Sequence, residues 1–129
     1  MFTIAQIKEA HSKVKSGADF PTYIQDLIDL GVHGYDTFVN DGHMEYFGAD
    51  NFRVAETDTY SKLVSAPLAN KERFIEFLVM HQDGQTDYPT FCNHAAQCGI
   101  AKWSVNILEM ICTYFDLSDS PVLIEKIQS

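Results

Sequence analysis

Cys92, His94 and Cys98 are metal-ligating residue types that lie close together in the sequence. Thiolate and imidazole groups are common ligands of Zn²⁺ in proteins. On a helix, Cys92 and His94 would point about 200° apart, whereas His94 and Cys98 would share a face. A zinc site also needs a fourth ligand and usually contains the tighter Cys-x-x-Cys spacing. We therefore predict no metal and no other cofactor, and we interpret the cysteines as reduced, partly buried thiols.

Cysteine catalysis is a second chemistry that these residue types allow. It needs a thiol with a lowered pKa and a base within hydrogen-bond reach, and neither can be seen in a sequence. The residues available are Cys92, Cys98 and Cys112 as nucleophiles, with His11, His33, His43, His81 or His94 as the base.

Paired carboxylates are a third candidate, because two such groups in a cleft can act as general acid and base. Asp36 and Glu45 could face one another across a hairpin, although Ser104 and Thr113 stand at the matching positions of the second half. The sequence contains none of the usual glycine-rich nucleotide motifs and no Gly-x-Ser-x-Gly. We predict no catalytic residues, and we interpret Asp36 and Glu45 as surface groups.

Aromatic residues are abundant, with nine Phe, six Tyr and one Trp. Tyr35, Tyr46, Trp103 and Tyr114 occupy matching positions in the two halves of the chain, so they could line a groove between them. Pockets favour such interfaces, and tyrosine hydroxyls can orient a ligand. These four residues are our candidates for ligand binding. Core packing and a partner-binding surface are the alternatives.

The chain repeats itself at an offset of 68 residues, which predicts a duplicated structural module. The match runs without a gap from residue 84 to residue 116. It aligns Asp87-Tyr-Pro-Thr-Phe with Asp19-Phe-Pro-Thr-Tyr, Gly99-Ile with Gly31-Val, Trp103 with Tyr35, and Tyr114-Phe115 with Tyr46-Phe47. Leu27 and Ile28 correspond to Ala95 and Ala96, while Tyr35 corresponds to the larger Trp103, as compensated packing would require.

Each copy is predicted to contain two helices followed by a strand meander. Thr3 and Asn70 are predicted to cap the first and third helices, and the second begins around Pro21, where Asp19 favours the N-terminal dipole. The predicted helix ends are Ser16-Gly17, Gly31, Asp83-Gly84 and Gly99. Apolar periodicity predicts a buried stripe of Tyr23, Ile24, Leu27 and Ile28 on the second helix. Strands are predicted over 35–39, 43–47, 52–55, 103–107, 110–115 and 122–127, with a short edge strand at 60–64 that Pro67 closes.

Size and pattern together predict an α+β fold in which helices cover one face of an antiparallel sheet. A unit of about 65 residues would be marginal alone, so we expect one domain over residues 1–129. Its pseudo-repeats would span about 1–66 and 67–129 and share one core.

The chain is acidic, with a formal net charge of −9. The excess is even, since residues 1–64 carry 5 basic and 10 acidic side chains and residues 65–129 carry 4 and 8. A surface without a basic stripe argues against nucleic-acid binding. The N-terminal sequence lacks the pattern of a signal peptide, and no segment approaches a membrane span. We therefore expect a cytoplasmic protein with neither nucleic-acid nor membrane partners.

Several short motifs resemble a family of uncharacterised bacterial and prophage-encoded proteins, the YdfO/YbcV-like group, sometimes labelled phage envelope protein. They are Gly31-Val32 with the following Tyr35-x-x-Phe38-Val39, Asp41-Gly42-His43, Tyr88-Pro-Thr-Phe-Cys92, Gly99-Ile-x-Lys-Trp-x-Val105 and Cys112-Thr-Tyr-Phe-Asp116. The resemblance covers essentially the whole chain. It implies a compact α+β domain of unknown function and a prophage origin, and it assigns no site residues. The composition of a soluble domain does not support the envelope label.

We therefore expect a non-enzymatic protein that modulates a protein partner or pairs with a second copy of itself. Exposed strands after Phe52 or Val122 would provide the edges for a homodimer. The alternative is a small-molecule-binding domain with an aromatic groove between the two repeats. An enzyme is the third hypothesis.

Overall fold

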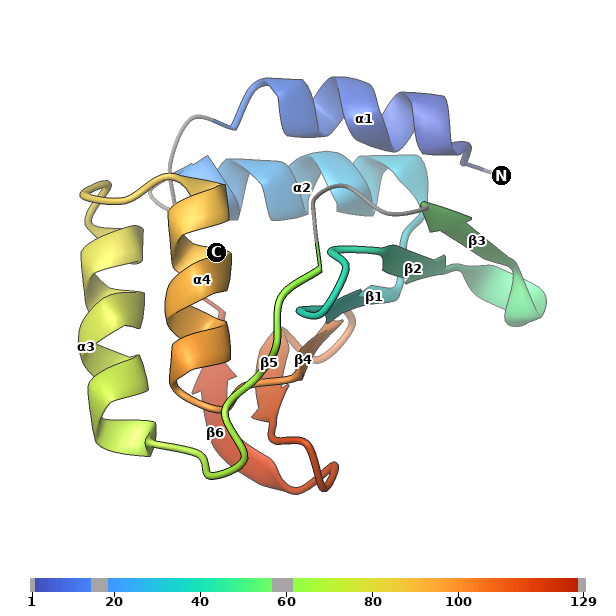
Figure 1. The fold of residues 1–129 in the computed structure, drawn as a ribbon. Coiled ribbons are helices and arrows are strands. Elements are labelled where there is room, and N and C mark those ends of the chain that lie inside the picture. Colours follow the sequence, from blue (N-terminus) through green and yellow to red (C-terminus); the bar gives the residue numbers. More distant parts are fainter. Residues whose placement is uncertain (1, 15–18, 57–61, 128–129) are drawn as a thin grey trace.

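The computed structural model describes residues 2–14, 19–56 and 62–127, and the predicted α+β fold is confirmed (Figure 1). Within these residues, four helices accompany one six-stranded sheet that is antiparallel throughout. The elements are α1 (Ile4–Ser12), α2 (Phe20–Leu30), β1 (Gly34–Phe38), β2 (Met44–Phe47), the 3₁₀ turn η2 (Ala49–Asn51), β3 (Arg53–Glu56), α3 (Lys71–Gln82), α4 (Tyr88–Gln97), β4 (Lys102–Asn106), β5 (Ile111–Phe115) and β6 (Pro121–Lys126).

Three of the helices begin at side-chain caps. Thr3 and Gln6 form a reciprocal capping box, in which each side chain accepts a hydrogen bond from the other residue's backbone N–H. Asn70 and Asp87 each accept from the backbone N–H three residues on, at 3.1 and 2.9 Å. Asp19 precedes α2 without a side-chain cap bond. The predicted starts at Thr3 and Asn70 are confirmed.

The sheet has the order β3-β2-β1-β4-β5-β6, so the two halves of the chain meet where β1 pairs with β4. In this strand pair Asp36 lies opposite Ser104, and the 68-residue offset aligns the same two residues. Equivalent hydrogen bonds close its two ends, from Val39 N to the carbonyl of Ala101 and from Ile107 N to that of His33. The order α-α-β-β-β therefore occurs twice around this junction. That the two halves arose by duplication stays a prediction.

The helices cover one face of the sheet. In Figure 1, α1 and α2 lie side by side, while α3 and α4 form a second pair at a steep angle to the first. Ring contacts connect both pairs to the same face, since Tyr23 of α2 meets Tyr35 and Phe91 of α4 meets Trp103. The buried strand residues on this face are Tyr35, Thr37, Met44, Tyr46, Trp103, Val105, Cys112 and Tyr114.

Two predictions about local structure were wrong. Ile28 was placed on the buried stripe of α2 but is 42% exposed, because this stripe consists of Tyr23, Ile24 and Leu27 alone. The predicted strand over 60–64 extends into residues outside the described part of the chain, and its described part, residues 62–64, is not a strand. Here Leu63 N donates to the turn carbonyl of Asn40.

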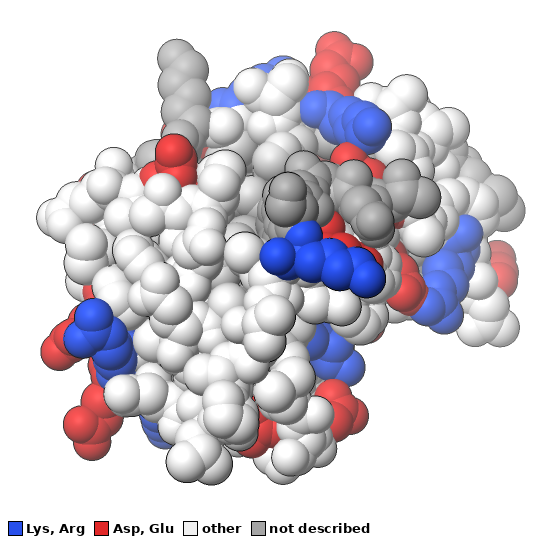
Figure 2. Space-filling view, in the orientation of Figure 1, with Lys and Arg blue, Asp and Glu red and all other residues white. Residues whose placement is uncertain are grey.

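The prediction that Ser16-Gly17 ends the first helix also falls outside the described residues. No helix in the described part of the chain has the length and apolar character needed to cross a bilayer. Figure 2 shows basic and acidic side chains scattered over the visible face, with no stripe of one sign.

The left-handed ends of α2 and α4 provide a matched test of packing. Gly31 has φ 93° and open space where a Cβ would lie. Gly99 has φ 80°, and a Cβ there would lie 2.5 Å from the carbonyl oxygen of Leu68. We expect Gly31→Ala to lower the free energy of unfolding by about 1 kcal/mol, from backbone strain alone. Gly99→Ala should lower the free energy of unfolding by roughly 2–4 kcal/mol, because the backbone at Leu68, in the segment before α3, must also move.

Urea unfolding of the two variants measures this difference. Equal losses would mean that the segment before α3 adjusts freely and is not packed as described.

Candidate functional site

A cavity of about 510 Å³ lies between the two helix pairs and the sheet. The ends of α1 and α3 and the starts of α2 and α4 converge at the same corner of the molecule (Figure 1). The lining residues come from both halves of the chain: His11, Val14, Phe20, Pro21, Tyr23, Tyr35, Thr37, Met44, Leu78, His81, Gln82, Tyr88, Phe91, Trp103, Val105, Cys112, Tyr114, Glu125, Lys126 and Ile127.

The floor of the cavity contains three of the four aromatic residues that the sequence singled out. Tyr35, Trp103 and Tyr114 line it, and the rings of Trp103 and Tyr114 lie 5.9 Å apart. Tyr46 lies outside the lining, with its ring 5.5 Å from that of Tyr35. A ligand-binding role for these residues stays a prediction.

The lining residues are more deeply buried on the sheet than at the helix ends. The floor residues of the cavity are almost fully buried, with Tyr35 at 3% and Trp103 at 6% exposure. Toward the mouth, His11, Phe20 and Tyr88 are only partly buried. A ligand would therefore enter between the helix ends and contact the floor with its leading group.

The floor also contains a hydroxyl group without a hydrogen bond. Thr37 Oγ1 is fully buried and has no partner among the described residues. A buried hydroxyl without a partner costs free energy, and a ligand or a water molecule could satisfy it.

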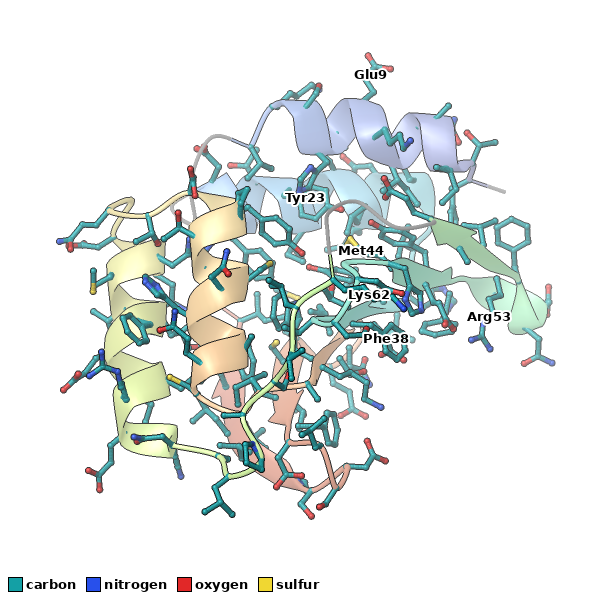
Figure 3. All side chains as sticks on the ribbon, in the orientation of Figure 1. Glu9, Tyr23, Phe38, Met44, Arg53 and Lys62 are labelled. Atoms are coloured by element: carbon teal, nitrogen blue, oxygen red, sulfur yellow. The ribbon has the colours of Figure 1, made fainter. Side chains whose placement is uncertain are left out.

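A tyrosine pair stands on the α2 side of the cavity. Tyr23 extends from α2 toward the sheet near Met44 (Figure 3). Burial raises the pKa of Tyr23 to about 12, and the nearby Tyr46 hydroxyl opposes this rise. Tyr46 donates to Met44 Sδ at 3.2 Å, and the Tyr23 hydroxyl has no well-oriented hydrogen bond among the described residues. Burial also raises the pKa of Tyr46. Both tyrosines are therefore neutral phenols at ordinary pH.

Two histidines at equivalent helix ends flank the mouth. His11 contacts the rings of Tyr23 and Tyr88 edge-on, at 5.3 and 5.9 Å. His81 stacks on Phe91 at 4.4 Å, and its Nδ1 lies 3.1 Å from the carbonyl oxygen of Thr86. Burial lowers the pKa of both imidazoles, so they favour the neutral form.

A carboxylate lies at the β6 side of the cavity. Glu125 lies opposite Cys112 in the β5–β6 pair, and its Oε2 accepts a hydrogen bond of 3.0 Å from Gln82 of α3. Burial, with a smaller contribution from Glu125, raises the pKa of the Cys112 thiol to about 12. This corner therefore combines an acidic group with a thiol that is a poor nucleophile.

Cys98 does not provide a better nucleophile. Burial raises the pKa of Cys98, which is the opposite of what thiolate catalysis needs. His94 stacks on Phe77 at 3.8 Å, away from the cavity. Among the residues that the structure describes, no three His, Cys, Asp or Glu side chains converge as metal ligands.

Asp36 and Glu45 pair across the first hairpin as the sequence predicts, on the sheet face opposite the helices. Glu45 also forms an ion pair with Arg53 and lies 3.3 Å from His43 Nε2. The other ring nitrogen of His43 lies 2.6 Å from Asp41, and its ring stacks on Phe38 at 4.2 Å. The carboxylate of Glu45 therefore already has local partners, which favours a structural role for this residue.

Sequence reasoning named His11 and His81 only among five possible bases and did not single out Glu125. His11 and His81 carried a signal, because an offset of 70 residues aligns the first helices of the two halves and places these histidines at matching positions. For Glu125 the only signal was the alternation of side chains along β6, which places it on the same face as Leu123. The Asp41-x-His43-x-Glu45 alternation was a similar signal for the cluster on the opposite face.

A family model described as "Protein of unknown function (DUF1398)" matches residues 8–126. The chain therefore belongs to the DUF1398 family. Among curated proteins, no sequence matches it significantly. Membership agrees with the expected family of unknown function, while the narrower YdfO/YbcV-like resemblance and a prophage origin stay predictions.

The cavity histidines should make stability depend on pH. Because burial lowers the pKa of His11 and His81 below the ordinary value of 6.5, the unfolded chain binds protons more readily than the folded protein. Glu56 opposes this effect at His11, as Thr86 and Asp87 do at His81. The neutral rings thus contribute fully above about pH 6.5, and their contribution is lost as the pH falls toward the lower folded pKa values.

We expect the free energy of unfolding to fall between about pH 7.5 and about pH 5.5, and to fall less in the His11→Gln/His81→Gln variant. Urea unfolding across this range measures the effect, and His33→Gln is the control because it lies outside the cavity. A fall of the same size in the double variant would contradict the assignment to these two rings.

Proposed function

We propose that this protein binds a small organic molecule in the cavity between its helix pairs. The observation that carries the proposal is the cavity itself, which combines ligand-sized volume, aromatic walls from both halves and a buried hydroxyl without a partner. Ligand sites commonly have volumes of roughly 300–1,000 Å³ and apolar walls with a few polar groups.

Binding without turnover is the form of this proposal that the local chemistry supports. The Cys112 thiol has a pKa of about 12, and the hydroxyls of Tyr35 and Tyr114 have pKa values raised well above 10.0 by burial. None of these groups would ionise readily at neutral pH to act as a nucleophile or base. The two histidines could accept a proton, but each ring packs against aromatic neighbours.

A variant that fills the mouth of the cavity tests this proposal. Val14 is partly buried and lines the cavity, so Val14→Phe should occupy ligand space with little effect on the core. Val79 is 57% exposed on α3, outside the lining, and Val79→Phe is the matched control. We expect native mass spectrometry to find a small molecule retained by the wild type and by Val79→Phe. Val14→Phe should retain roughly tenfold less, because the added ring and the ligand compete for one space.

The protein would be exposed to the low-molecular-weight fraction of its expression host before the measurement. Trp103 fluorescence, recorded on the same samples, should shift with the retained mass, because the indole lies on the cavity floor. A wild-type protein that retains no added mass and shows no change in Trp103 emission would contradict the proposal.

A second proposed function is interaction with another protein, including a second copy of the chain, within the cytoplasm of a prophage-bearing host. Strands β3 and β6 form the two edges of the sheet. Lys8 of α1 forms an ion pair with Glu56 at the β3 edge, whereas Ile124 of β6 is 64% exposed. An open edge with an exposed branched apolar side chain favours strand pairing, so β6 is the better candidate for a homodimer.

Ile124→Lys tests this edge, because charged edge residues oppose strand pairing. If β6 joins two copies, native mass spectrometry should show a dimer for the wild type and at least tenfold less dimer for Ile124→Lys. Leu108→Lys is the control, since Leu108 is 70% exposed in the β4–β5 turn, away from either edge. A dimer that survives Ile124→Lys would exclude this edge.

A further inference from the structure

We infer that the ligand of the cavity is an organic cation, such as an amine or a quaternary ammonium compound with an apolar body. This inference rests on the proposed binding function and specifies its ligand class. It depends on the balance between negative and positive groups around the cavity.

The aromatic rings are the first part of that balance. Their faces carry negative partial charge and attract cations, most strongly where water is excluded. The lining includes seven such side chains: Phe20, Tyr23, Tyr35, Tyr88, Phe91, Trp103 and Tyr114.

The cations that the structure describes do not lie over these rings. Within the described residues, the cations that lie over aromatic rings pair with Phe47, Phe77 and Phe115, at 4.7–5.2 Å, and none of these rings lines the cavity. His81 covers one face of Phe91, and no cation among the described residues lies over the other rings of the lining.

Glu125 is the second part of the balance. It is the only carboxylate in the lining that the structure describes, and Gln82, a neutral residue, donates to it. Lys126, the next residue, is exposed, and strand alternation directs its side chain to the opposite face of β6. Lys126 lines only the exposed rim of the cavity, so a bound ammonium group could face Glu125 from the side that the alternation of β6 turns away from this lysine.

The N-termini of the helices at the mouth of the cavity do not reverse the preference for a cationic ligand. Helix N-termini attract anions, and α2 and α4 both begin here. Asp87, however, already accepts a hydrogen bond from Thr90 N at the start of α4, and Asp19 precedes α2. The lowered pKa values of His11 and His81 also leave these imidazoles neutral at pH 7. Among the residues that the structure describes, Lys126 is the only lysine or arginine in the lining, and it is exposed.

Three probes of similar shape separate charge from apolar contact. They are (4-hydroxybenzyl)trimethylammonium, its neutral isostere 4-neopentylphenol, and the anion 4-hydroxyphenylacetate. Isothermal titration calorimetry at low salt and pH 7 should show the cation binding roughly tenfold more tightly than the neutral isostere, with the anion weakest. Equal or tighter binding of the isostere would overturn the cation inference and leave the proposed function intact. No binding of any probe would overturn both.

A matched pair of variants then tests the role of Glu125. Glu125→Gln should weaken binding of the ammonium probe several-fold and leave binding of 4-neopentylphenol unchanged. Glu9→Gln makes the same change in net charge on the outer side of α1, where Glu9 points away from the molecule (Figure 3), and it should bind all probes as the wild type does. Equal effects of both variants would show that only the overall charge matters, which would contradict a specific cation site.

Discussion

The pairing of β1 with β4 is the constraint on which the rest of the structure depends. It joins two three-stranded meanders into one sheet and makes both helix pairs share one covered face. Gly34 permits this close approach, because a Cβ at that position would lie 2.7 Å from the carbonyl oxygen of Val105. Any larger residue would push the two halves apart at the centre of the sheet, where no other element could compensate.

The cavity follows from the same junction. Each helix pair packs mainly over its own half of the sheet, as the contacts from Tyr23 to Tyr35 and from Phe91 to Trp103 show. Because the two pairs meet at a steep angle, their ends converge without filling the space above the junction (Figure 1). The walls are therefore contributed by both halves, and neither half could form the site alone.

Those parts of the fold that depend on short-range signals could be predicted from the sequence. Thr3 and Asn70 mark helix starts because a capping side chain bonds to backbone only three residues away. The strand pattern predicted an antiparallel sheet covered on one face, and Tyr35 and Trp103 both lie on that face. Such signals depend on neighbours along the chain or on a repeated pattern, and both are visible without a structure.

The contributions of Glu125 and His81 to the site could not be predicted in this way. Glu125 reaches the cavity only because β6 lies at the sheet edge beneath α3, where Gln82 contacts it across 43 positions of sequence. The exposure of Ile28 depends equally on what lies over α2 in space. No local pattern contains this information, since it is set by how the helix pairs are placed on the sheet.

The comparison of Ile28 with Ala96 shows how this placement makes the two halves differ. Both residues occupy matching positions on their helices, yet Ile28 is 42% exposed and Ala96 is 5% exposed. The segment before α3 runs along the end of α4, where Ala66 N donates to the carbonyl oxygen of Ala96 at 2.8 Å. A side chain as large as isoleucine would obstruct that approach. Small residues on α4 therefore follow from the covering segment as well as from the larger indole of Trp103, and each half has adapted to a different neighbour.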